Sequence, residues 1–483
     1  MNQSLKCRAC WLVLMAMGMF SLSFGAVPAA AQKEPLKDSD ITLAVETELI
    51  YAEAVPAHKI DVSTENGIVT LAGSVDSYYA KLEAENVARS VKGVLAVINN
   101  IVVQPVERTD AEIREDVVAA LLADPVTETF EIDVSVDEGI VTLTGEVDSY
   151  TEKRVAEEVA ERVRGVVDVE NALNYDVVSG RTDADIQADV SYRLKSTASI
   201  DATLVTVNVD DGNVTLEGSV GSAAEKSEAE TEAWLVPGVT SITNNLEVKW
   251  WLDGGRDAWG DGWTDADMQE AIENALVANP RLTSFDIVVA VENGVATLSG
   301  TVENLEAKRA AEEEAQDTLG VWRVKNYIRV RPSDARTDAA IANDVRDALR
   351  RDPYVDRYDI GVNVYNGKVF LTGEVDSWYM KDLAEENAAG VRGVTDIRNN
   401  LDVDYEATAK TDREIKEDIE SQLFWSPFVD SDDVTVKVRS GVATLMGTVE
   451  DWDEMQAAKE NARDGGATSV INKLDVEHGY GAD

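Results

Sequence analysis

The chain contains 483 residues, of which 44 are Lys or Arg and 91 are Asp or Glu, so its formal net charge is −47. A charge of this sign argues against a nucleic-acid-binding protein, because phosphate binding requires a basic surface. The hydrophobic fraction of 44% is ordinary for a folded protein, so the charge does not indicate wholesale disorder.

Residues 1–31 have the pattern of a secretory signal peptide. Two basic residues precede an apolar run at 11–24, and small residues at 29–31 come just before Gln32. The apolar run is shorter than the roughly 18 residues expected of a membrane-spanning helix. We therefore predict that cleavage near Gln32 removes both basic residues and both cysteines of this segment, which moves the net charge from −47 to −49.

A Leu-x-Gly-x-Val motif recurs six times in the rest of the chain. Its glycines are Gly73, Gly145, Gly218, Gly300, Gly373 and Gly447. A motif that recurs at such regular spacing indicates an array of similar units. A typical domain size of roughly 150 residues suggests three domains for this chain, and the repeat replaces them with six smaller units. One insertion, 250–263, interrupts the spacing and is predicted to be a Gly/Asp/Trp-rich linker. Its aspartates do not have the spacing of an EF-hand loop, which leaves a calcium site there as the weaker alternative.

Each unit is predicted to begin with a short amphipathic helix. Thr-Asp pairs such as Thr109-Asp110 supply the N-cap, and Glu112 completes a capping box. Apolar residues then recur at i, i+4 and i+8, which predicts one buried stripe. The stripes are Ile41/Val45/Leu49, Ile113/Val117/Leu121, Ile186/Val190/Leu194, Met268/Ile272/Leu276, Ile341/Val345/Leu349 and Ile415/Ile419/Leu423.

A β-hairpin, a second helix and a last strand are predicted to follow. Turn dipeptides such as Asn66-Gly67 favour positive φ and mark the hairpin. The second helix carries two alanines four residues apart, such as Ala84 and Ala88, which indicate close helix packing. A glycine then ends the helix. The predicted fold class is α+β: a tandem repeat of six small αββαβ units, each with two helices packed on a three-stranded sheet. The predicted units are 38–104, 109–177, 182–249, 264–331, 337–405 and 411–478.

The order of these motifs resembles the BON domain (bacterial OsmY and nodulation). The resemblance covers all six units. It implies a protein of the bacterial envelope, usually periplasmic, that binds phospholipid or bridges envelope components under osmotic or envelope stress. The family is not known for enzymatic activity, and its motif defines no binding residues.

The sequence offers little for catalysis. The chain has two histidines, His58 and His478, in different units and at unrelated positions, so neither a catalytic triad nor a histidine metal site is predicted. Nucleotide-binding loops are absent from the sequence, and no cofactor is predicted. An asparagine recurs inside each last strand, for example Asn99, and we interpret it as satisfying backbone groups rather than as a binding row.

The candidate contact residues lie in units five and six. Arg346 and Arg350 are four residues apart on one helix face with Arg351 beside them, although neighbouring aspartates oppose their charge. Trp378 and Tyr379 follow the cap of the next helix, where they could anchor in a membrane interface or pack inside the protein. The predicted lipid or partner contacts are Arg346, Arg350, Arg351, Trp378, Tyr379 and Trp425.

These observations predict an exported, non-enzymatic, modular binding or scaffold protein of the envelope. The partners this implies are a phospholipid membrane surface or envelope proteins and polymers, and the location is the periplasm or, alternatively, outside the cell. A rival interpretation is an acidic stress protectant that works by remaining soluble and has no specific ligand. An enzyme is the less favoured third alternative.

Overall fold

The computed structural model describes residues 36–52, 54–105, 107–127, 132–175, 180–251, 263–282, 286–332, 336–355, 358–403 and 410–476. The predicted signal peptide, most of the predicted linker and His478 lie outside these residues. Among the described residues, no helix has the length and apolar character needed to cross a membrane.

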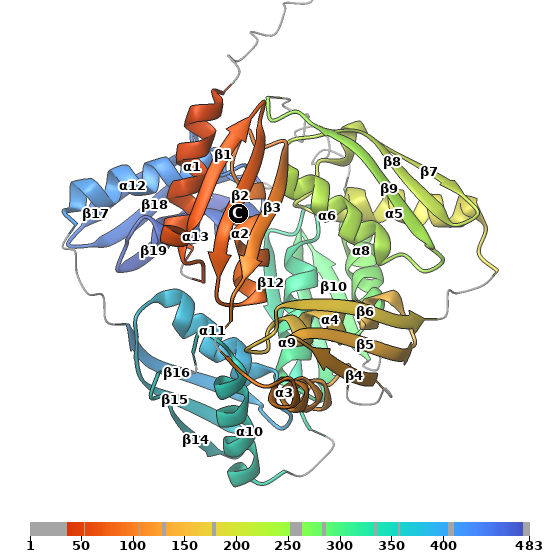
Figure 1. Cartoon of the computed structure of the whole chain (residues 1–483). Helices are drawn as coiled ribbons and strands as arrows, with labels where there is room; N and C mark the ends of the chain where they lie inside the picture. Colours follow the sequence, from red (N-terminus) through yellow and green to blue (C-terminus); the bar gives the residue numbers. More distant parts are fainter. Residues whose placement is uncertain are drawn as a thin grey trace, which may run out of the picture. The chain divides into compact units, whose positions relative to one another are not determined.

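Units 1 to 3 contain helices and strands in the same order, and Figure 1 shows them in chain order from red to green. Unit 1 contains α1 (Asp38–Tyr51), η1 (Ala57–Lys59), β1 (Ile60–Glu65), β2 (Ile68–Val75), α2 (Tyr78–Arg89) and β3 (Ala96–Val103). Unit 2 contains α3 (Asp110–Ala123), β4 (Ile132–Asp137), β5 (Ile140–Val147), α4 (Tyr150–Glu161) and β6 (Asp168–Tyr175). Unit 3 contains α5 (Asp183–Ser196), η2 (Ala202–Leu204), β7 (Val205–Asp210), β8 (Asn213–Val220), α6 (Ala223–Trp234) and β9 (Ser241–Val248).

Units 4 to 6 repeat this order. Unit 4 contains α8 (Asp265–Ala278), β10 (Ile287–Glu292), β11 (Val295–Val302), α9 (Leu305–Gln316), β12 (Arg323–Asn326) and β13 (Arg329–Val330). Unit 5 contains α10 (Asp338–Arg351), β14 (Gly361–Tyr365), β15 (Lys368–Val375), α11 (Trp378–Ala389) and β16 (Asp396–Val403). Unit 6 contains α12 (Asp412–Trp425), β17 (Val434–Arg439), β18 (Val442–Val449), α13 (Trp452–Asp464) and β19 (Ser469–Val476).

Each unit has one sheet in which the middle strand pairs antiparallel with the strand before it and parallel with the strand after the second helix. In unit 1, Leu71 of β2 lies opposite Val62 of β1 and Asn99 of β3. In unit 4 the last strand is divided into β12 and β13, although both pair with β11 in one continuous register. The predicted fold class, six αββαβ units of two helices and a three-stranded sheet, is confirmed.

The core of each unit lies between its helices and its sheet. Every member of the six predicted helix stripes is buried, and Val117 and Val345 are fully inaccessible to solvent. Ala84 and Ala88 of α2 are likewise 0% exposed, as are their counterparts in the other units. Small side chains at these positions allow close packing of the second helix, as the alanine spacing predicts.

The first helices of units 2 to 6 begin at the threonines that the sequence marks as N-caps, whereas α1 of unit 1 begins after Lys37 without a side-chain cap. Thr109 and Glu112 form the predicted capping box, and so do Thr411 and Glu414. Asp185 and Asp267 complete two further boxes, at Thr182 and Thr264, because a carboxylate at this position can reach back to the N-cap backbone.

The aspartate at the first position of each first helix holds the hairpin turn of its own unit. The carboxylate of Asp338 accepts hydrogen bonds from the backbone N–H groups of Asn366 and Gly367, at 2.9 and 3.0 Å. Both turn residues have positive φ, and their N–H groups point to the helix. The same pair of bonds is made by Asp38, Asp110, Asp183, Asp265 and Asp412. This contact therefore fixes the hairpin against the first helix in all six units.

Residues Leu36–Asp483 form one compact unit, and one type of backbone contact recurs between its repeats. The N–H of the residue before the glycine turn donates to the last carbonyl of the first helix in another repeat. The pairs are Lys92 to Trp425 at 2.8 Å, Arg164 to Arg351 at 3.1 Å and Leu319 to Ser196 at 2.8 Å. Unit 1 is thus bonded to unit 6, unit 2 to unit 5, and unit 4 to unit 3.

Candidate functional site

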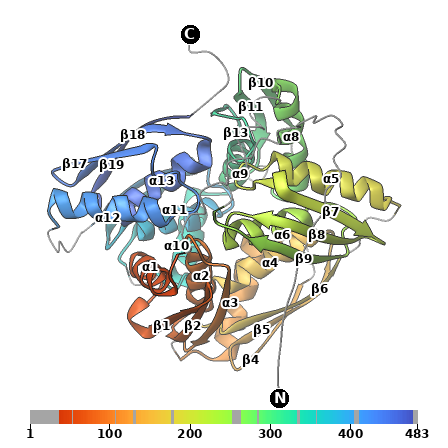
Figure 2. The same cartoon turned by 90° about the horizontal axis from the view of Figure 1, so that it is seen from above.

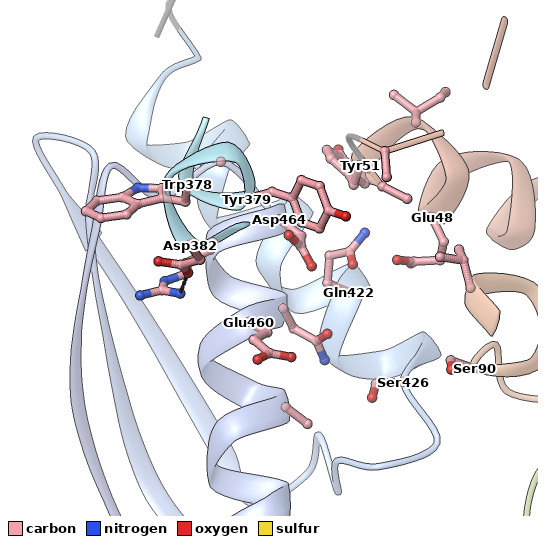
Figure 3. Close-up of a pocket in the computed structure, with 18 of the residues that line it drawn as sticks. Glu48, Tyr51, Ser90, Trp378, Tyr379, Asp382, Gln422, Ser426, Glu460 and Asp464 are labelled. Atoms are coloured by element: carbon pink, nitrogen blue, oxygen red, sulfur yellow. Dashed lines mark hydrogen bonds and ion pairs between the residues drawn. The ribbon is translucent and has the colours of Figure 1, made fainter. Parts of the chain in front are cut away.

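A pocket of about 870 Å³ lies among units 1, 5 and 6, and we call it the junction pocket (Figure 3). The last turn of α1 and helix α2 line it from unit 1, the first turn of α11 lines it from unit 5, and α12 and α13 line it from unit 6. The residues of these walls are far apart in the sequence. The junction pocket therefore depends on how the repeats are packed together.

Carboxyl groups dominate the polar lining of the junction pocket. Desolvation, together with the charge of Asp464, raises the pKa of Glu48 to about 8. Desolvation and the charge of Glu460 raise the pKa of Asp464 to about 7, although the residue is partly open to solvent. Desolvation also raises the pKa values of Glu83, Glu460 and Asp382. The lining therefore favours either bound protons or a positively charged group.

Aromatic rings and cations complete the walls of the junction pocket. The charged groups of Lys381 and Arg463 lie 5.0 and 5.3 Å from the centre of the Trp378 indole ring. Arg463 also pairs with Asp382 at 3.1 Å. The Lys410 ammonium lies 5.1 Å from the ring of Tyr51, on the opposite side. Such cation–ring contacts stabilise the packing of unit 6 against units 1 and 5.

The junction pocket also contains two buried hydrogen-bond donors. Trp378 Nε1 and Asn461 Nδ2 are buried and have no hydrogen-bond partner among the described residues. Within that same part of the chain, no group of three His, Cys, Asp or Glu side chains could hold a metal ion. His58 is exposed on η1, at a position that does not line the pocket. The arrangement offers charge, hydrogen bonds and aromatic surface to a ligand.

The structure brings two of the predicted contact residues into the junction pocket. Trp378 and Tyr379 both line it, and the Tyr379 hydroxyl donates to the Tyr79 hydroxyl of unit 1 at 3.5 Å. Trp425 is half-buried at the same junction, and its carbonyl is the acceptor for Lys92. The aromatic residues of units 5 and 6 thus contact other repeats of this chain.

The three arginines predicted as contacts lie on α10, and none of them lines the junction pocket. Arg346 donates to Asn343 Oδ1 at 3.0 Å and to the carbonyl oxygen of Val362 at 2.8 Å. Arg350 is exposed and pairs with Asp347 one turn earlier. Arg351 is half-buried, and desolvation lowers the pKa of its guanidinium.

The recurring asparagines have the structural role that the sequence indicates. Asn171 Nδ2 donates to the carbonyl of Lys153 at 2.8 Å, and its Oδ1 accepts from the N–H of Leu173 at 3.3 Å. By contrast, sequence reasoning missed Glu48, Glu83 and Asp464. These residues lie on helices rich in exposed acidic side chains, so nothing in the pattern distinguishes them from solvated carboxylates.

The sheet of each unit has an outer face, opposite its two helices, and the outer faces differ between units. On the last strand, four alternate residues are exposed. They are Ala96/Ile98/Asn100/Val102, Asp168/Glu170/Ala172/Asn174, Ser241/Thr243/Asn245/Glu247, Arg323/Lys325/Tyr327/Arg329, Asp396/Arg398/Asn400/Asp402 and Ser469/Ile471/Lys473/Asp475. The residue types at the buried positions are similar in all six repeats, whereas the residue types at these outer positions differ.

Comparisons with known proteins agree with this repeat. The family model described as BON domain matches residues 37–105, 109–176, 182–249, 264–332, 337–405 and 411–478. Over 145 residues the chain is 32% identical to the osmotically-inducible protein Y of Escherichia coli (strain K12), which covers 29% of this chain and 72% of that protein. Over 110 residues it is 32% identical to the outer membrane lipoprotein DolP of Haemophilus influenzae (strain ATCC 51907 / DSM 11121 / KW20 / Rd), covering 22% of this chain and 57% of that protein.

A solved structure of the C-terminal domain of CdsD, described as the structural protein of the type III secretion system of Chlamydia trachomatis, aligns at 13% identity. The alignment covers 46% of this chain and 99% of the CdsD chain, and its TM-score of 0.12 is too low to support an argument. The six family matches and the relative from Escherichia coli are sufficient by themselves to assign the family. The chain belongs to the BON domain family, and it carries six copies of that domain.

Proposed function

We propose that this protein is an exported, non-enzymatic binding or scaffold protein of the bacterial envelope that acts under osmotic or envelope stress. The names of two relatives, an osmotically-inducible protein and an outer membrane lipoprotein, support this setting. The signal-peptide pattern of residues 1–31 supports a periplasmic location after cleavage, with secretion from the cell as the alternative. Phospholipid or another envelope component is the proposed ligand.

One observation carries the proposal: the repeats share their inward positions and differ in their outward ones. The buried helix stripes and alanine pairs recur in all six units. The exposed residues of the last strands range from two acidic residues in unit 2 to three basic residues in unit 4. Surfaces presented side by side in one chain can combine several weak contacts, because the first contact raises the effective concentration of the next.

The acidic-protectant interpretation has its own supporting observation. Exposed carboxylates such as Asp168, Glu170 and Asp402 lie on the outer faces of several units, where they favour solubility. A protectant of this kind needs no saturable ligand, whereas a binding protein does. The predicted contacts at Arg346, Arg350 and Arg351 remain a proposal within the binding interpretation.

Equilibrium binding of the full mature chain to phospholipid vesicles and to purified peptidoglycan tests the proposal. Saturable binding to either component supports an envelope-binding protein. Binding to neither, combined with protection of other proteins from aggregation in high salt, would favour the protectant interpretation. Because the assay measures the whole chain, it does not depend on which unit makes the contact.

A further inference from the structure

The outer face of the unit 4 sheet carries an unusual concentration of positive charge for a chain of net charge −47. Arg323, Lys325, Arg329 and Arg331 are all exposed along β12, β13 and the residue that follows. The backbone continues to pair with β11 throughout, because Tyr327 N–H bonds to Leu298 and Arg331 N–H bonds to Val302. Alternate residues of a strand point the same way, so the four cations form one row, which we call the basic row.

The basic row has no counterpart in the other units. At the four equivalent positions of the last strand, unit 4 has three cations and no carboxylate. Units 1 and 6 have no net charge there, and units 2, 3 and 5 are net acidic at the same positions. Since the positions are structurally equivalent, the fold does not require these cations.

Among the described residues, the ion pairs of unit 4 leave out the cations of the basic row. None of the four forms an ion pair with another residue in the described part of the chain. Two other arginines of unit 4 are paired, Arg281 with Glu306 and Arg309 with Glu385 of unit 5. This outer face of the unit 4 sheet, which we call the unit 4 face, therefore presents positive charge to an external anionic group.

The rest of the unit 4 face suits a membrane surface. Tyr327 is 64% exposed within the basic row, and Val288 of β10 is 62% exposed on the same face. Between them, β11 points the hydroxyl side chains of Thr297, Ser299 and Thr301 outward. Helices α8 and α9 belong to the other side of this sheet, where Ala296 and Leu298 are buried (Figure 2). A flat face of cations, hydroxyls, a tyrosine and a valine matches the phosphates and interfacial region of an anionic bilayer.

We propose that the unit 4 face, with the basic row at its centre, is the surface through which this protein contacts anionic phospholipid. The inference rests on the proposed envelope-binding function and names its surface. Three exposed carboxylates lie at the margins of this face: Glu292 is two strands away from Arg323, and Asp286 and Glu303 lie at the end of the sheet near Arg329 and Arg331. At physiological salt, charges beyond about 8 Å are largely screened, so the local row outweighs the distant acidic surfaces.

Sedimentation with vesicles tests the proposal. The full mature chain is mixed with phosphatidylcholine vesicles that contain about 30% phosphatidylglycerol, at about 150 mM salt with a chelator present. Arg323→Gln/Arg329→Gln is compared with the matched variant Arg413→Gln/Lys416→Gln, which removes the same charge from the outer side of α12 in unit 6. Each basic residue at an anionic surface contributes on the order of fivefold in partitioning. We therefore expect the unit 4 variant to bind about 25-fold more weakly, and the unit 6 variant to bind like wild type.

Several results would overturn the inference. They are equal binding by wild type and the unit 4 variant, a larger loss in the unit 6 variant, equal binding to pure phosphatidylcholine, or no vesicle binding by wild type. Unchanged thermal unfolding of both variants shows that a loss of binding is not a loss of fold. If wild type binds peptidoglycan saturably but not vesicles, the proposed function stands and the lipid surface fails. If it binds neither, both fail.

Discussion

Asn99 of β3 donates its side-chain amide to the backbone carbonyl of Lys81 in α2 at 2.9 Å, while its Oδ1 accepts from the N–H of Ile101 at 3.1 Å. The second helix and the last strand are thereby joined by one side chain. The bond to the lysine carbonyl recurs in four further units, at Asn171, Asn244, Asn326 and Asn399.

We expect Asn99→Ala to lower the free energy of unfolding by about 1–3 kcal/mol, because it leaves half-buried backbone groups without partners. The matched control is Asn100→Ala, since Asn100 is the next residue and is exposed on the outer face. Urea unfolding of the two variants measures the difference. Equal stability would show that the asparagine contributes no net stabilisation.

Asp338→Ala tests the contact between the first helix and the hairpin turn. The variant removes the acceptor for the N–H groups of Asn366 and Gly367, so we expect a loss of about 1–2 kcal/mol. Hydrogen exchange at these two amides should accelerate. Asp402→Ala, an exposed aspartate on the outer face of the same unit, serves as the control and should change neither quantity.

Ala198→Pro tests the contact between units 3 and 4. Ala198 N–H donates to the Asp317 carbonyl at 2.8 Å, in addition to the bond from Leu319 to Ser196. The equivalent residues of units 5 and 6 are Pro353 and Pro427, which have no N–H to donate.

The local backbone of unit 3 accepts the proline. Thr197 has φ −82° and ψ 121°, within a few tens of degrees of Ser426, at −67° and 129°, which precedes Pro427. We expect the fold to be kept at a cost of about 1 kcal/mol, with faster amide exchange in residues 314–321. Ala198→Ser retains the N–H and should exchange like wild type. Unchanged exchange in the proline variant would mean that this bond does not hold the units together.

Stability should depend on pH through the junction pocket. Folding raises the pKa of Glu48 from 4.5 to about 8, so the folded state binds the proton more tightly. The contribution of protonated Glu48 to the free energy of unfolding is therefore fully present below about pH 4.5 and is lost as pH rises toward 8. Asp464, Glu83 and Glu460 act in the same direction.

Glu48→Gln removes the Glu48 part of this dependence. We expect the variant to be more stable than wild type at pH 8 and similar to it at pH 4.5, as measured by thermal unfolding at both values. Glu46→Gln, an exposed position on the same helix, is the control. A variant that is no more stable than wild type at pH 8 would contradict the assignment of Glu48 to a desolvated position.

The repeat and the internal structure of each unit could be read from the sequence. The stripe of Ile113, Val117 and Leu121, the turn at Asn66-Gly67 and the alanine pairs all depend on helical or strand periodicity over short stretches. Six copies in register make such local patterns unambiguous. The fold class was predictable for this reason.

Contacts between distant residues were decided by the tertiary structure. Nothing local distinguishes Asp338 as the partner of a turn 28 residues later, because an aspartate in the first turn of a helix is already explained by the helix dipole. Trp378 and Tyr379 could be placed just after a helix cap, but whether they met lipid or another repeat depended on how units 1, 5 and 6 pack.

The sequence by itself determined which residues each unit buries, because burial follows a period set by the helix and the strand. The tertiary structure alone decided which residues on the surface of one unit are covered by another unit. Glu48 and Glu46 are two residues apart on one helix of an acidic chain, yet the packing of unit 6 desolvates the first and leaves the second in water. That difference arises from surfaces more than 350 residues apart in the chain, and no local pattern encodes it.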